Sequence, residues 1–150
     1  MFNIKRLSLA DAQKLIKGAK RKAKRIDVPM CIAVADESGN LIAFERMDGA
    51  KILSVGLSAD KAFTAAISKR PTHEYNEICQ PGNLAYGIHT SSGGRFSIVG
   101  GGFPVVIRNT VVGAIGLSGG AVEQDMECAE AAVRGFLGAK AFDKRYCRTT

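Results

Sequence analysis

Apolar residues near the start of the chain recur at alternating spacings of three and four, which is typical of a helix that buries one face. The members of this stripe are Leu9, Ala12, Ile16, Ala19, Ala23 and Ile26. Ser8 precedes the stripe and belongs to the residue types that cap helix N-termini. The helix should end before Pro29, because the residue preceding a proline disfavours helical angles.

The pattern then changes to short apolar runs separated by turn residues. Residues 30–36 are apolar on both faces, residues 37–40 are turn formers, and residues 41–46 can return as a second strand, so we expect an antiparallel hairpin. A second helix is expected up to Pro71, followed by a short one over residues 72–79. The core side of the second helix should present Ile52, Val55, Ala59, Phe63 and Ala66.

The second half of the chain is rich in glycine and β-branched residues and ends in a helical stripe from Val122 to Phe136. Strands are expected over residues 96–99, 105–107 and 111–117. Strands joined by two-residue turns pair antiparallel, and helices then cover the faces of the sheet. The sequence therefore predicts one α/β (α+β) domain over residues 1–138, followed by a basic tail over residues 139–150.

The net charge of +7 is concentrated at the two ends of the chain. Residues 1–25 hold nine of the 21 lysines and arginines, whereas the middle of the chain is mildly acidic. Such ends can attract phosphate or an acidic partner. Because no nucleic-acid-binding motif accompanies the charge, we expect a solvated helix face and no nucleic-acid partner.

Other classes of protein are excluded by simple patterns. No apolar run approaches the roughly 20 residues needed to cross a bilayer, so we expect no membrane partner. No apolar segment follows the charges at the start of the chain, which favours a cytoplasmic protein over a secreted one. The four cysteines are widely spaced and form no Cys-x-x-Cys pair, so we expect no metal site.

Two glycine-rich segments are candidates for binding a ligand. Glycine lets another group approach the backbone closely, and a helix start presents N–H groups with partial positive charge. The candidate residues are Gly100, Gly101, Gly102, Ser118, Gly119, Gly120, Glu123 and Asp125. Two alternatives stay open: a bulge at a subunit contact for the triple glycine, and a tight turn whose N–H groups are satisfied by Glu123 for the helix start.

The second helix has an unusual face that carries Lys61 among small and hydroxylic residues. A face exposed to water would normally carry more charge, so we expect something to cover it. Lys61 could bind a carboxylate there, or it could be an ordinary surface ammonium. The two histidines, His73 and His89, lie beside hydroxyl groups, where each could be a general base, an axial metal ligand or simply a surface residue.

Several segments together resemble the GlcG/HbpS family, which includes the C-terminal domain of the PduO cobalamin adenosyltransferase. They are Asp60-Lys61-Ala62-Phe63-Thr64-Ala65, Gln80-Pro81-Gly82, Gly100-Gly101-Gly102-Phe103-Pro104-Val105 and Val112-Gly113-Ala114-Ile115-Gly116-Leu117-Ser118-Gly119-Gly120, with Glu123-Gln124-Asp125 and the early hairpin. The resemblance covers roughly residues 7 to 138. It implies a profilin-like fold with a central antiparallel sheet of about five strands, and homo-oligomers from dimer to octamer.

The same resemblance implies a function. Some relatives bind heme, one is a lyase, and several occur beside genes of diol, glycerol or glycolate metabolism. The heme-binding relatives use a histidine near the first helix, and this chain has none before His73.

Two hypotheses follow from these observations. The first is a small-ligand-binding accessory protein for heme or a corrinoid, with its pocket between subunits. The alternative is a small lyase or isomerase in which His73 or His89 moves a proton and Lys61 holds a carboxylate.

Overall fold

The computed structural model describes residues 1–138, and the predicted tail over residues 139–150 lies outside them. The helices are α1 (Leu9–Arg25), α2 (Leu53–Ser68), α3 (Glu74–Ile78), the 3-10 helix η1 (Ile88–Thr90), α4 (Ser91–Gly94) and α5 (Val122–Leu137). The strands are β1 (Cys31–Asp36), β2 (Leu41–Arg46), β3 (Gly102–Ile107) and β4 (Thr110–Ser118). The predicted hairpin, the long helices and the α+β class are therefore confirmed.

The strands form one antiparallel sheet in the order β2-β1-β4-β3. The part of the chain that the structure describes thus has four strands rather than about five. Residues 96–99, predicted as a strand, are irregular because their backbone bonds to side chains: the Ser97 N–H donates to Thr64 Oγ1 at 2.8 Å and the Val99 carbonyl accepts from Thr72 Oγ1 at 2.7 Å. These backbone groups are therefore not available to pair with a neighbouring strand.

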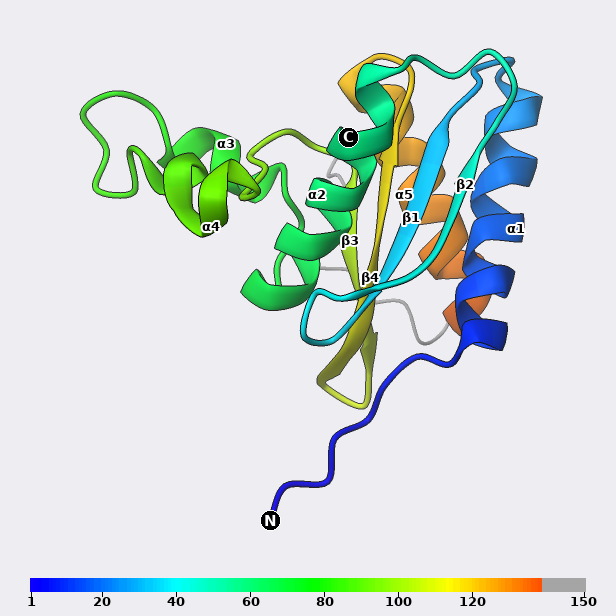
Figure 1. Cartoon of the computed structure of the whole chain (residues 1–150), viewed down its shortest axis with the longest axis horizontal. Coiled ribbons are helices and arrows are strands. Elements are labelled where there is room, and N and C mark those ends of the chain that lie inside the picture. The colour runs from blue at the N-terminus through cyan, green and yellow to red at the C-terminus, as the bar shows by residue number, and fades with distance from the viewer. Residues whose placement is uncertain (139–150) are drawn as a thin grey trace.

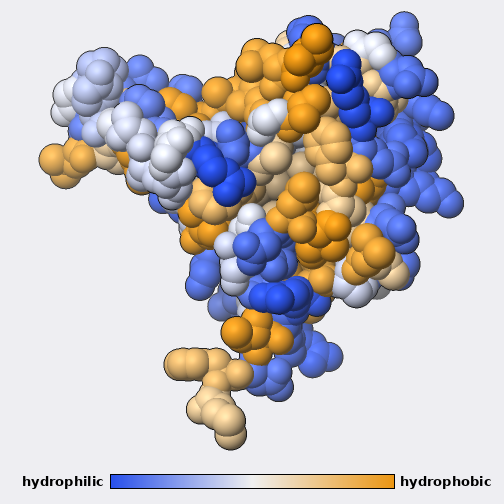
Figure 2. Space-filling view, viewed as in Figure 1, coloured by the Kyte–Doolittle hydropathy of each residue, from blue (hydrophilic) through white to orange (hydrophobic). Residues whose placement is uncertain are grey.

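Helices cover both faces of the sheet. α1 and α5 lie side by side on one face, and α2 lies on the other (Figure 1). The main core fills the space between the sheet and the α1–α5 layer, and it includes Leu15, Met30, Phe103, Ile115 and Leu117. The outer side of α1, which carries Lys14, is hydrophilic, as Figure 2 shows along the right edge of the molecule.

α2 packs on the sheet through its small and hydroxylic face, which corrects the predicted orientation of this helix. Ser58, Lys61 and Thr64 are fully buried. Of the predicted core residues Ala66 is buried, but Val55 is 37% exposed and Ile52, just before the helix, is 80% exposed. The helix backbone approaches β4 so closely that a Cβ on Gly116 would lie 2.1 Å from the Ser58 carbonyl oxygen. The face that sequence analysis expected something to cover is therefore covered by the protein's own sheet.

The segment between α2 and β3 projects from the body of the molecule (Figure 1). A small cluster of Tyr75, Cys79 and Phe96 anchors it, and the Tyr75 and Phe96 rings meet edge to face. At its far end Leu84 and Tyr86 are exposed. Across the described residues, no helix combines the length and apolar character needed to span a membrane.

Candidate functional site

Lys61 is the centre of a buried polar cluster. Its side chain is fully buried, and Nζ donates hydrogen bonds to Asp125 Oδ2 at 2.8 Å and to the Leu117 carbonyl oxygen at 2.9 Å. Burial lowers the pKa of Lys61 and raises the pKa of Asp125, because both charged forms lose water, while their mutual attraction opposes each shift. Lys61 therefore joins α2 to β4 and α5 and is enclosed by the protein.

The triple glycine bend closes over this cluster. Gly101 has a φ of +120°, and a Cβ there would lie 2.7 Å from the Leu117 carbonyl oxygen and 3.0 Å from Lys61 Nζ. The Gly101 carbonyl accepts from the Leu117 N–H at 3.0 Å, and the Gly102 N–H donates to Thr72 Oγ1 at 3.0 Å. A Cβ on Gly100 would lie 2.6 Å from the sulfur of Met126. Glycine at these positions makes room for the neighbouring atoms of Leu117, Lys61 and Met126.

The turn between β4 and α5 is also satisfied internally. The Gly120 N–H donates to Asp125 Oδ1 at 3.0 Å, and the Ala121 N–H donates to Gln124 Oε1 at 2.9 Å. One of the two alternatives left open by the sequence gave this role to Glu123, but Glu123 is exposed, and Gln124 and Asp125 supply the acceptors instead. The Ser118 hydroxyl bonds to the Ser54 hydroxyl at 3.0 Å.

A Cβ on Gly119 would lie 2.3 Å from the Pro29 carbonyl oxygen, so this glycine admits the segment before β1. The structure thus brings Lys61, Asp125 and both predicted glycine segments together, as one internally paired cluster that fixes the start of α5 and the entry to β3.

The two histidines lie in different surroundings. His73 is half-buried beside α3, and its ring centroid lies 5.6 Å from that of Phe103. His89 is exposed in η1 and lies 6.3 Å from the Tyr86 ring. His89 lines an open cleft, whereas the Lys61 ammonium is turned into the buried cluster. Because the Lys61 ammonium is buried and paired with Asp125, it is not available to hold a substrate carboxylate, as the lyase hypothesis requires.

That cleft lies between α2 and the base of the projecting segment and has a volume of about 250 Å³. Its lining residues combine an imidazole, an ion pair, an aromatic ring and apolar side chains: Leu57, Asp60, His89, Gly94, Arg95, Phe96, Ser97, Ile98 and Val99. Arg95 Nε donates to Asp60 Oδ1 at 3.1 Å, and the guanidinium lies 4.1 Å from the centroid of the Phe63 ring. Within residues 1–138, no group of three or more metal-ligating side chains is present.

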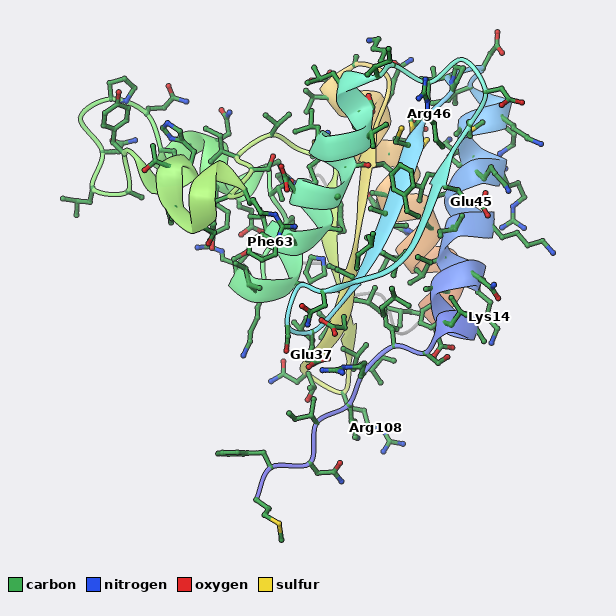
Figure 3. All side chains as sticks on the ribbon, in the orientation of Figure 1. Lys14, Glu37, Glu45, Arg46, Phe63 and Arg108 are labelled. Atoms are coloured by element: carbon green, nitrogen blue, oxygen red, sulfur yellow. The ribbon has the colours of Figure 1, made fainter. Side chains whose placement is uncertain are left out.

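This cleft could not be predicted from the sequence, because most of its lining comes from residues 94–99, which have no periodic pattern, and they meet Leu57 and Asp60 of α2 only in the folded chain. Arg95 follows the Gly93-Gly94 pair in the acidic middle of the chain, far from the basic ends. An arginine that stands apart from the other basic residues was the sequence feature that could have pointed to this site. Phe63 had been placed in the core, yet it is only half-buried and projects from α2 on the side remote from α1 (Figure 3).

Comparison with known proteins identifies relatives of this chain. The family model described as "Haem degrading protein HbpS-like" matches residues 7–134. The "Uncharacterized 15.0 kDa protein in dhaT-dhaS intergenic region" of Citrobacter freundii is 41% identical over 127 residues, 85% of this chain and 89% of that protein. The "Corrinoid adenosyltransferase PduO" of Salmonella typhimurium is 35% identical over 127 residues, 85% of this chain but only 38% of PduO.

A solved structure agrees with these matches. The "PduOC:Heme Complex" crystal structure has a TM-score of 0.82 and 34% identity to this chain, and the similarity covers 85% of this chain and 93% of the other. The predicted family is confirmed: the chain belongs to the HbpS-like family.

Proposed function

We propose that this protein is a small-ligand-binding accessory protein that takes a planar tetrapyrrole, heme or a corrinoid, in the cleft lined by His89 and Arg95. The observation that carries the proposal is this combination of an exposed imidazole, a guanidinium and apolar walls in one cleft. A relative with 34% identity has been solved as a heme complex, which supports the same ligand class for this chain.

The side chains that line the cleft are of the types that bind heme in proteins. The imidazole of His89 would bind heme iron, and the Arg95 guanidinium would pair with a propionate carboxylate. Leu57, Phe96 and Ile98 offer apolar surface to the macrocycle. When bound, heme would supply one-electron chemistry at its iron.

The size of the cleft indicates that one chain does not enclose such a ligand. Ligand pockets commonly measure about 300–1,000 Å³, and this cleft measures about 250 Å³. A tetrapyrrole bound here would extend beyond the cleft, where a second copy of the chain could cover it. The proposal therefore includes a homo-oligomer.

The predicted ligand-binding residues take a different role in this proposal. Lys61, Asp125, Ser118 and the glycines at positions 100–102, 119 and 120 hold the entry to β3 and the start of α5 in place. In this way they support the cleft from inside. The predicted link to diol, glycerol or glycolate metabolism stays part of the proposal.

Titration with hemin and with cobalamin tests the proposal. We expect an absorbance change on adding one of them, and we expect His89→Gln to change the hemin spectrum while the matched variant His73→Gln does not. Light scattering with and without ligand then measures the oligomer. Failure of both ligands to bind the unaltered protein would contradict the proposal.

A further inference from the structure

Arg95 is held in place on more than one side. Its Nε donates to Asp60 Oδ1 at 3.1 Å, and its guanidinium lies over the face of Phe63, 4.1 Å from the ring centroid. The Thr64 hydroxyl accepts from the Ser97 N–H at 2.8 Å and donates to the Arg95 carbonyl at 3.3 Å, so the backbone is fixed to α2 as well. Both ends of this long side chain are therefore positioned before a ligand arrives.

The aromatic platform under Arg95 is itself fixed by the turn between β1 and β2. Gly39 has a φ of +85°, and a Cβ there would lie 2.7 Å from the Phe63 ring and 2.9 Å from Ile67. Glycine at this turn thus makes room for the ring on which the guanidinium lies. A stacked guanidinium loses little conformational freedom when it binds an anion, because its orientation is already set.

Arg95 also keeps most of its donors available. A guanidinium has five N–H donors, and within residues 1–138 the hydrogen bond found for the Arg95 side chain uses Nε alone. The side chain is 48% exposed and lines the cleft. Lys61 differs on every count, because it is buried and its ammonium is held by Asp125 and Leu117.

We infer that Arg95 is the residue of the cleft that binds a carboxylate of the ligand, and that Asp60 weakens this binding by its opposing charge. The inference rests on the proposed function and deepens it by naming the ligand class: a planar molecule that carries at least one free carboxylate. It also moves the carboxylate-binding role, expected at Lys61, to Arg95.

A comparison of hemin with its dimethyl ester tests the inference, because esterification removes the carboxylates and leaves the macrocycle. Arg95→Ala should weaken hemin binding about tenfold to a hundredfold, the effect of losing a charge-assisted hydrogen bond, and should change ester binding less than about twofold. Asp60→Asn should act in the opposite direction and strengthen hemin binding about fivefold, again without effect on the ester.

Arg70 offers a matched control. Its Nε also pairs with a carboxylate, Glu74 at 2.8 Å, and its guanidinium also lies over a ring, Tyr75 at 5.5 Å, but it does not line the cleft. Arg70→Ala should leave both affinities unchanged. If Arg95→Ala does not fold, Arg95→Lys replaces it, and the loss of the planar fork should still separate hemin from its ester.

The outcomes separate the inference from the proposed function. Equal weakening of hemin and ester by Arg95→Ala, or no weakening, overturns the role of Arg95 and leaves tetrapyrrole binding intact. If the unaltered protein binds neither probe, the proposed function fails, and 2-naphthoate with its methyl ester then decides: Arg95-dependent binding of the acid alone supports the inference, and absence of binding overturns it.

Discussion

Removing the ammonium of Lys61 should be among the most destabilising single changes in this protein. Lys61→Met keeps most of the side-chain volume but deletes hydrogen bonds of 2.8 and 2.9 Å and leaves the Asp125 carboxylate buried without its counter-charge. Breaking a buried ion pair from one side costs about 3–5 kcal/mol, which is a large fraction of the 5–15 kcal/mol typical of a domain. Urea denaturation at pH 7 measures this loss.

The stability that Lys61→Met loses should depend on pH. Burial already raises the pKa of Asp125 above its ordinary value of 3.8, and the nearby Lys61 charge opposes this shift. Lys61→Met removes that charge and should raise the pKa further, so the folded variant should bind more protons than the unfolded chain between the two values. Stability then falls as pH rises through that window, by at most about 1.4 kcal/mol per pH unit. The penalty of Lys61→Met should therefore shrink in acid.

Asp125→Asn should show the opposite slope. Burial already lowers the pKa of Lys61 below its ordinary value of 10.5, and the Asp125 charge opposes this shift. Removing that charge should lower the pKa further, so the unfolded chain should bind more protons between the two values. Stability rises with pH in that window, so this penalty should shrink in alkali. Lys20→Met is the matched control, because Lys20 pairs with Glu45 at the surface and should cost no more than about 1 kcal/mol. A loss below 1 kcal/mol for Lys61→Met, or parallel pH slopes for the two core variants, would refute the reasoning.

Three further predictions concern the glycines and the surface ion pair. Gly101→Ala should lower the melting temperature by several degrees, since its Cβ would lie 2.7 Å from the Leu117 carbonyl oxygen, whereas Gly56→Ala, with no atom within 4 Å of its Cβ, should raise it slightly. Gly39→Ala should displace Phe63 and weaken hemin binding relative to its ester in the same titration that tests Arg95. Arg6 lowers the pKa of Glu37 from 4.5 to about 2, so the stabilisation that Glu37→Gln removes should be present above pH 4.5 and vanish as pH falls toward 2 in thermal melts.

The elements with local signals could be predicted from the sequence. The stripe before Pro29 gave α1, whose capping box between Ser8 and Asp11 is present in the structure. The turn residues 37–40 gave the β1–β2 hairpin, and the stripe after Val122 gave α5. These elements depend on periodicity and turn chemistry within a few residues, which a single sequence contains.

The orientation of α2 could not be predicted in the same way. The bulky apolar residue Leu53 in its first turn is 76% exposed, while Ser58 and Thr64 are buried against the sheet. Hydrophobicity alone favours the reverse. The deciding factor is distance: glycine at position 116 of β4 allows the helix backbone to approach, and only small side chains fit between them. That constraint joins residues nearly 60 positions apart, which no local pattern reveals.

Our proposal of a different site from the one predicted has the same cause. A motif of glycines, a lysine and an aspartate can bind a ligand or close a fold, and the difference lies in whether its polar groups are paired from within. Here Lys61, Asp125 and the amides of Gly102 and Gly120 have partners within the protein. The motif therefore fixes the starts of β3 and α5 relative to α2. The polar side chains that line the cleft, His89 and Arg95, are exposed instead. Thr64 fixes the irregular segment around Arg95 to α2. The proposed binding site thus lies where the backbone leaves regular structure and is held by side chains of a neighbouring helix.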